Sequence, residues 1–168
     1  TGFRTFVRVD GTYTECFAIE KNPHEMTISM NRLQIMEDNK AAEIKTTVTY
    51  YTLPGEKLGA LVRKVEIENT GGESRTVEVL DGMPAVIPYG VDMDSMKSMT
   101  QTSKAWMQVE DVDKKRPYFR VRASMEDSAS VHSIEGGNFS IGCTEDGNRL
   151  QPVVDPESIF DYDNSLEY

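Results

Sequence analysis

The residues of this sequence that could take part in chemistry are two histidines, a few clusters of acids and scattered aromatic side chains. His24 and His132 are the only imidazoles, and neither has a second His or a Cys at the spacing of a metal site. A Ser-His-Asp arrangement would depend entirely on the fold bringing distant residues together. We therefore expect structural or surface histidines, and the sequence predicts no catalytic residue.

Two clusters of acids have the composition of cation ligands, but each has a simpler interpretation. Asp92 and Asp94 lack the further oxygen ligands and the bidentate Glu of a calcium loop, which favours helix capping or solvent exposure. Residues 145–148 read Glu-Asp-Gly-Asn, which is typical of a tight turn. The 28 acids give no basis for choosing the two carboxylates of a glycosidase. We predict no metal site and no cofactor.

Aromatic residues give the better lead, because sugars stack the apolar C–H faces of their rings on aromatic side chains. The candidates for carbohydrate binding are Tyr51, Tyr89, Trp106 and Tyr118. The alternative for Trp106 is a core position, where a lone Trp of a β-sandwich is more often found. Residues 83–90, which read Met-Pro-Ala-Val-Ile-Pro-Tyr-Gly, are apolar and rich in Pro and Gly, as in a loop that docks on another surface.

Composition excludes several classes of partner. The net charge of −10 disfavours nucleic acid and anionic membranes, because both are bound through clustered Lys and Arg. No stretch approaches the roughly 20 apolar residues of a membrane span. Cys16 and Cys143 match no zinc spacing, and we expect two buried free thiols, with a disulfide as the alternative. The expected location is the cytoplasm.

Hydrophobic alternation and turn residues predict an all-β fold, a two-sheet antiparallel β-sandwich with at most one short helix. Asp10-Gly11 is a strong hairpin signal, and Asp92 is a candidate helix cap. A chain of 168 residues is expected to form one domain, residues 1–168. Its first residue is not Met, and residues 155–168 include aromatic side chains that would normally pack on another surface, so we expect a domain excised from a longer protein. The predicted strands are 3–9, 13–20, two short strands within 26–36, 42–53, 61–68, 76–80, 105–109, 118–125, 131–134 and 139–143.

Two consecutive segments resemble a known family. Residues 49–57 read TYYTLPGEK, and residues 62–82 read VRKVEIENTGGESRTVEVLDG. The first segment is extended, the second begins with a strand that ends in Asn69 and a small polar turn, and the next strand begins with Arg75. This order resembles the N-terminal sandwich domain of the cellobiose and chitobiose phosphorylase and cyclic β-1,2-glucan synthase group.

The resemblance implies a large two-sheet supersandwich, like that of galactose mutarotases. In the full enzyme this domain would pack against a catalytic (α/α)₆ barrel of the same chain, with carbohydrate as ligand and a homodimer as a further assembly. The barrel carries the general-acid Asp and the phosphate site of that family, so no catalytic residue is transferred to this chain.

Two functional hypotheses follow. The first is a non-catalytic N-terminal sandwich domain of a glycoside phosphorylase, glycosyltransferase or glycoside hydrolase, which shapes the rim of the active site and mediates domain or subunit contacts. It predicts an exposed apolar patch made partly of residues 83–89 and the tail 160–168. The second is an independent carbohydrate-binding or adhesion module, which predicts a row of exposed Tyr or Trp side chains.

Overall fold

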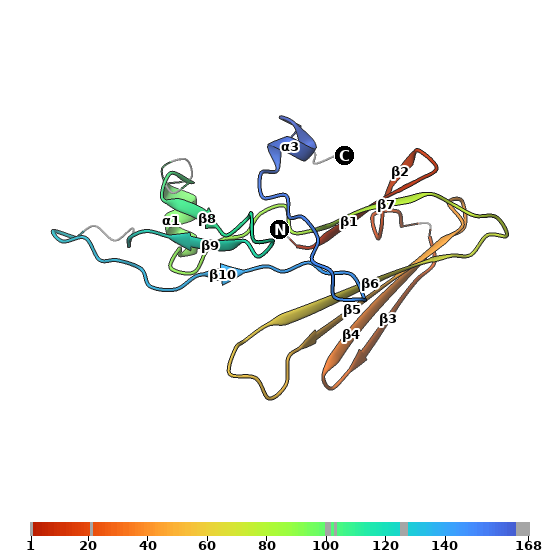
Figure 1. Ribbon diagram of the computed structural model, residues 1–168, viewed down its shortest axis with the longest axis horizontal. Helices are drawn as coiled ribbons and strands as arrows, with labels where there is room; N and C mark the ends of the chain where they lie inside the picture. The colour runs from red at the N-terminus through yellow and green to blue at the C-terminus, as the bar shows by residue number, and fades with distance from the viewer. Residues whose placement is uncertain (1, 21, 100–101, 103, 125–127, 164–168) are drawn as a thin grey trace. The chain divides into compact units, whose positions relative to one another are not determined.

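The protein is mostly β in a computed structural model that describes residues 2–20, 22–99, 102, 104–124 and 128–163. Strands hold 40% of the residues and helices 8%, and the strands form three antiparallel sheets (Figure 1). The predicted all-β, sandwich-like fold is confirmed. The chain divides into two compact units, Thr1–Met83 and Pro84–Tyr168. That residues 1–168 act as one domain stays a prediction.

The first sheet of the N-terminal unit has the order β2-β1-β7. Its strands are β1 (Arg4–Val9), β2 (Thr12–Glu15) and β7 (Val77–Gly82). Asp10 and Gly11 join β1 to β2 with positive φ angles of 47° and 86°, the conformation of the predicted hairpin turn. Strand β2 ends before the predicted residue 20, because Phe17 takes a φ of 66° and donates its N–H to the Glu37 carboxylate.

The second sheet of this unit has the order β3-β4-β5-β6. Its strands are β3 (His24–Ser29), β4 (Arg32–Asn39), β5 (Ile44–Thr52) and β6 (Leu61–Asn69). Strand β5 alternates as predicted, with Ile44, Thr46 and Val48 buried on one face. The predicted turn after β6 is also present, where the Asn69 carboxamide accepts the N–H of Gly71 at 3.0 Å.

The core of the N-terminal unit lies between these two sheets. Val7 and Val9 of β1 form a buried cluster with Cys16 and with Ile44 of β5. The partly buried side chains packed on this cluster are Phe17, Ala42, Ile67 and Val77. Since the cluster draws on both sheets, it is the apolar layer that a face-to-face sandwich buries.

The two cysteines differ in environment. Both are free, and Cys16 is buried while Cys143 is exposed. The prediction of free thiols is confirmed for both residues, and the prediction of burial is wrong for Cys143. That residue lies in the predicted strand 139–143, of which only Phe139 belongs to a strand, β10 (Asn138–Phe139). Cys143 itself forms an isolated bridge with Arg149.

We predict that the two thiols react at very different rates. Burial raises the pKa of Cys16 from 9.0 to about 11, so this thiol is both inaccessible and protonated near neutral pH. A thiol reagent at pH 8 should modify Cys143 quickly and Cys16 only after unfolding, as counted by mass spectrometry. Because the folded-state pKa lies above the unfolded value, Cys16 should also lower stability as the pH rises from 9 towards 11. Modification of both thiols at equal rates in the folded protein would contradict the burial of Cys16.

The C-terminal unit contains the third sheet, of order β10-β9-β8. Its strands are β8 (Met107–Glu110), β9 (Tyr118–Val121) and β10 (Asn138–Phe139). The predicted strand 118–125 ends at Val121, and Met125 lies outside the described residues. The predicted strand 131–134 is reduced to an isolated bridge between Ala123 and Ser133.

Two short helices with defined bounds lie among the described residues of this unit, whereas the sequence predicted at most one. In α1 (Met93–Ser98), the Asp92 side chain accepts the N–H of Ser95 at 2.6 Å, which confirms the predicted cap. The second helix, α3 (Glu157–Phe160), is a single turn. In the part of the chain that the structure describes, neither helix has the length and apolar character needed to cross a membrane.

Candidate functional site

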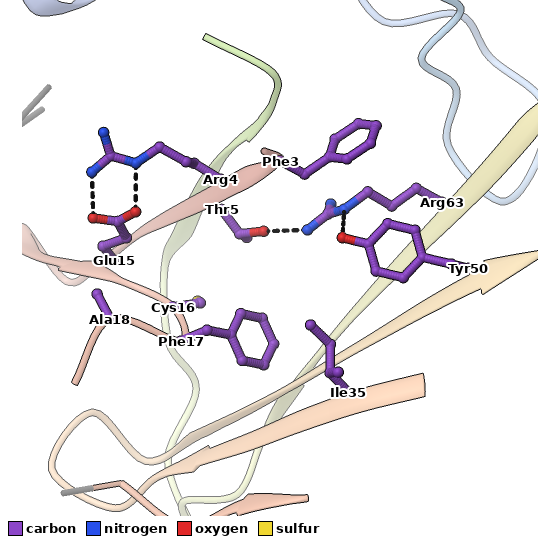
Figure 2. A pocket seen from close by; sticks show the side chains of 10 residues that line it. All are labelled: Phe3, Arg4, Thr5, Glu15, Cys16, Phe17, Ala18, Ile35, Tyr50 and Arg63. Carbon is purple, nitrogen blue, oxygen red and sulfur yellow. Dashed lines mark hydrogen bonds and ion pairs between the residues drawn. The ribbon is translucent and has the colours of Figure 1, made fainter. Parts of the chain in front are cut away.

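A cavity of about 190 Å³ lies in the N-terminal unit (Figure 2). Strands of both sheets position it: β1 and β2 of the first sheet, and β4, β5 and β6 of the second. Arg63 of β6 lies directly opposite Tyr50 of β5 in the ladder. The residues around it are Phe3, Arg4, Thr5, Glu15, Cys16, Phe17, Ala18, Ile35, Tyr50 and Arg63. The cavity therefore lies where the two sheets of this unit meet.

Arg63 is the central group of this cavity, and its side chain is only 6% exposed. Its Nε donates to the Tyr50 hydroxyl at 2.9 Å and its Nη2 to the Thr5 hydroxyl at 2.7 Å. Its Nη1 forms an ion pair with Asp81 of β7. The guanidinium carbon also lies 5.1 Å from the ring centre of Phe3 and 5.4 Å from that of Tyr50, in cation–π range.

The second cation of the cavity is also neutralised within the protein. Arg4 makes a forked pair with Glu15, with both N–O distances at 2.6 Å. This pair raises the pKa of Arg4 further, chiefly through the hydrogen bond to Glu15. Arg4 and Arg63 each form an ion pair with a carboxylate of the same unit. The side chains around the cavity therefore link the two sheets, and neither guanidinium is left to bind an anionic ligand.

A third group of polar residues surrounds the buried carboxylate of Glu37. Its oxygens accept hydrogen bonds from the backbone N–H of Phe17, from the Asn22 carboxamide at 3.0 Å and from the His24 ring at 3.0 Å. The other imidazole, His132, bonds the Ser130 hydroxyl at 3.1 Å on an exposed segment. His24 thus has a structural partner.

The third sheet carries aromatic and polar side chains together on one face. In the register of β8 and β9, Gln108 lies opposite Arg120 and Glu110 opposite Tyr118, while Phe139 of β10 lies opposite Tyr118 on its other side. Residues that are directly opposite share a face. Trp106 lies in the turn directly before β8, and its carbonyl accepts the N–H of Arg122 at 3.3 Å, so the pairing with β9 continues by one residue. If the alternation of β8 is continued to this residue, Trp106 falls on the same face. We call Trp106, Gln108, Glu110, Tyr118, Arg120 and Phe139 the aromatic face.

Solvent reaches the aromatic face. Trp106 is 37% exposed and Phe139 41%. The Glu110 carboxylate lies 3.7 Å from the Arg120 guanidinium, and both side chains are partly exposed. Apolar rings and hydrogen-bonding groups are therefore available together, which is the composition of sites that bind small polar ligands.

Glycine at position 137 allows Tyr118 to lie across the sheet. A Cβ at this position would be 2.7 Å from Cζ of Tyr118 and 2.5 Å from the carbonyl oxygen of Phe119. No side chain fits there without displacing the ring or the backbone. The Tyr118 ring therefore occupies the space that a side chain at position 137 would otherwise fill.

The four sequence candidates for carbohydrate binding divide among three places. Trp106 and Tyr118 belong to the aromatic face, and the exposure of Trp106 shows that the core alternative is wrong. Tyr89 borders the same Gly136–Asn138 segment, where its N–H donates to the Asn138 carboxamide at 2.7 Å and its ring lies beside Gly136. Tyr51 lies in the N-terminal unit, on β5.

Sequence reasoning missed four members of the aromatic face: Gln108, Glu110, Arg120 and Phe139. Alternation within residues 106–110 is a signal that would have grouped Gln108 and Glu110 with Trp106. No comparable signal relates Phe139 to Tyr118, because their pairing joins segments about twenty residues apart in the chain.

The acidic clusters have the structural roles that the sequence favoured. The N–H and hydroxyl of Ser95 lower the pKa of Asp92, as expected for a helix cap. The Thr144 hydroxyl lowers the pKa of Asp146 within a turn, where Thr144 donates its N–H to the Asn148 carbonyl at 2.9 Å. Within the described ranges, no three His, Cys, Asp or Glu side chains come close enough together to hold a metal ion.

No known family model matches the chain. No curated protein matches its sequence either.

Proposed function

We propose that this chain is a non-catalytic β-sandwich of a carbohydrate-processing enzyme, and that it contacts carbohydrate through the aromatic face. The proposal depends on one observation, the placement of Trp106, Tyr118 and Phe139 on the same face as Gln108, Glu110 and Arg120. The exposed rings of Trp106 and Phe139 offer apolar surfaces to the C–H faces of a sugar. The carboxylate, carboxamide and guanidinium beside them are acceptors and donors for its hydroxyls.

The resemblance of residues 49–57 and 62–82 to the sandwich domain of cellobiose and chitobiose phosphorylases supports the wider role. In that role the domain packs against a catalytic (α/α)₆ barrel of a glycoside phosphorylase, glycosyltransferase or glycoside hydrolase and extends the rim of its active site. The exposure of Ile87 at 41% and Tyr89 at 61% favours a docking role for residues 83–89. Phe160 is buried, and residues 164–168 of the predicted apolar tail lie outside the described residues.

The second candidate function is an independent carbohydrate-binding module. It is favoured by the same exposed rings, because a module must hold its sugar without help from a barrel. We place either form in the cytoplasm, since two free thiols fit a reducing compartment.

A titration of this chain separates the two functions. Trp106 is the only tryptophan, so its fluorescence reports on the aromatic face alone. If the chain is an independent module, Trp106 emission should change saturably with one or more members of a panel of glucose, cellobiose, chitobiose and longer glucans, and calorimetry should give the same affinity. If the chain is an accessory domain whose sugar is held mainly by the barrel, the folded chain alone should bind none of them measurably. Saturable binding would favour the independent module, and no binding by the folded chain would leave only the accessory role.

Three variants locate the binding surface. Phe139→Ala keeps the Trp106 reporter and should weaken binding about tenfold, which is the loss expected for one stacking ring. Val109→Ala is the matched control, because Val109 lies opposite Phe119 on the other face of the same sheet. Tyr51→Ala tests the remaining sequence candidate in the other unit. Binding that is lost in Tyr51→Ala and kept in Phe139→Ala would refute the aromatic face.

A further inference from the structure

Strand β3 forms an open edge of the four-stranded sheet. It pairs with β4 on one side, and no other strand in the described part of the chain pairs with its second side. The Asp38 N–H donates to the Pro23 carbonyl at 3.0 Å, so residues 23, 25, 27 and 29 bond towards β4. The backbone N–H and C=O groups of His24, Met26 and Ile28 therefore point away from β4, towards the open edge.

The open edge is also apolar on one face. Met26 is 63% exposed and Ile28 74%, and both lie on the face of the sheet that carries Leu33 and Ile35, their partners in β4. The only acid of the strand, Glu25, lies on the other face. The strand contains no Lys or Pro, the residues with which edge strands usually discourage pairing.

The other edge strands of the N-terminal unit are less suited to pairing. Strand β6 carries Arg63, Lys64, Glu66 and Glu68 within nine residues. Strand β7 carries Glu78 and Asp81, and β2 has only four residues. Among these edges, β3 therefore combines the most apolar surface with the least charge.

We propose that β3 pairs antiparallel with β3 of a second copy of this chain, around a two-fold axis at Thr27. In this register Met26 faces Ile28 of the second copy, so apolar side chains oppose apolar side chains on one continuous face. Glu25 faces Ser29, and the two Glu25 side chains are separated by four positions, roughly 13 Å at about 3.3 Å per residue. A shift by one residue would oppose Glu25 to Ile28 and divide the apolar face. In this register each apolar side chain of the strand therefore lies opposite an apolar side chain of the second copy, and no two acids lie opposite each other.

A charge exchange at Thr27 tests this pairing. The two Thr27 residues face each other on the two-fold axis, so Thr27→Lys alone and Thr27→Glu alone each oppose like charges. Sedimentation equilibrium of the unmodified chain should show a dimer of twice its 18.9 kDa at high concentration. We expect each variant to raise the dimer dissociation constant roughly tenfold, and an equimolar mixture of the two to restore the dimer.

The control and a second measurement make the test decisive. Val79→Lys places the same charge on exposed β7 and should leave the dimer intact. Thr27→Cys, in a Cys143→Ser background, should form an intermolecular disulfide under mild oxidation, because residues in a non-hydrogen-bonded pair bring their side chains close. A monomer at all concentrations, or a dimer that responds to Val79→Lys and not to Thr27→Lys, would overturn the proposal.

Discussion

Replacing Glu37 with alanine should lower the free energy of unfolding of the N-terminal unit by about 3 kcal/mol, because a partly buried backbone donor and two side chains lose their acceptor. The Glu37 side chain is 2% exposed. It accepts a hydrogen bond from the N–H of Phe17, where the chain leaves β2. It also accepts hydrogen bonds from Asn22, which precedes β3, and from His24, the first residue of β3. One carboxylate therefore fixes the whole connection between the two sheets. A loss of this size is a large part of the 5–15 kcal/mol that stabilises a typical domain.

Urea unfolding followed by circular dichroism measures this effect. Glu37→Gln should be milder, since its carbonyl oxygen can still accept one of the three bonds. Glu25→Ala is the matched control, because Glu25 is an exposed acid on the adjacent strand β3, and surface changes of this kind usually stay within about 0.5 kcal/mol. Equal urea midpoints for Glu37→Ala and Glu25→Ala would show that the buried carboxylate contributes nothing to stability.

Replacing Arg63 with alanine should cost about 2 kcal/mol or more, because the change removes one member of a largely buried ion pair and leaves the other behind. Asp81 would keep the Thr5 hydroxyl at 2.7 Å as a donor, but would lose its cation. Phe3 and Tyr50 would lose the guanidinium packed against their rings. Since Thr5, Tyr50 and Asp81 come from three strands, the loss should loosen both sheets together.

Two comparisons identify the cause of this loss. Arg63→Lys keeps the charge but lacks the planar fork that reaches three partners, so it should recover only part of the stability. Lys64→Ala removes a neighbouring cation whose ion pair with Glu66 is half exposed, and surface pairs contribute about 0–1 kcal/mol. The same urea measurement applies. Full recovery by Arg63→Lys would mean that charge alone matters, and the geometry of the fork would then be irrelevant.

Local sequence signals predicted those elements that depend on a few neighbouring residues. Asp10-Gly11 specified the β1–β2 hairpin, because few other residues accept positive φ at both positions. Asp92 specified the start of α1 through its bond to Ser95. The predicted strand 13–20 was too long because Glu37, twenty residues after Phe17, captures the backbone where β2 ends. A bond of that sequence separation leaves no local signal.

The amino-acid sequence by itself determined the all-β class, most of the strands and the residue types able to stack on a sugar, because alternation, turn residues and aromatic rings are local properties. Only the tertiary structure decided which of those rings lie together. Trp106 and Tyr118 share a face with Phe139 because three strands pair in one register, whereas Tyr51 lies in the other unit. Register depends on backbone hydrogen bonds between distant segments, and a shift by one residue would move every side chain of a strand to the opposite face.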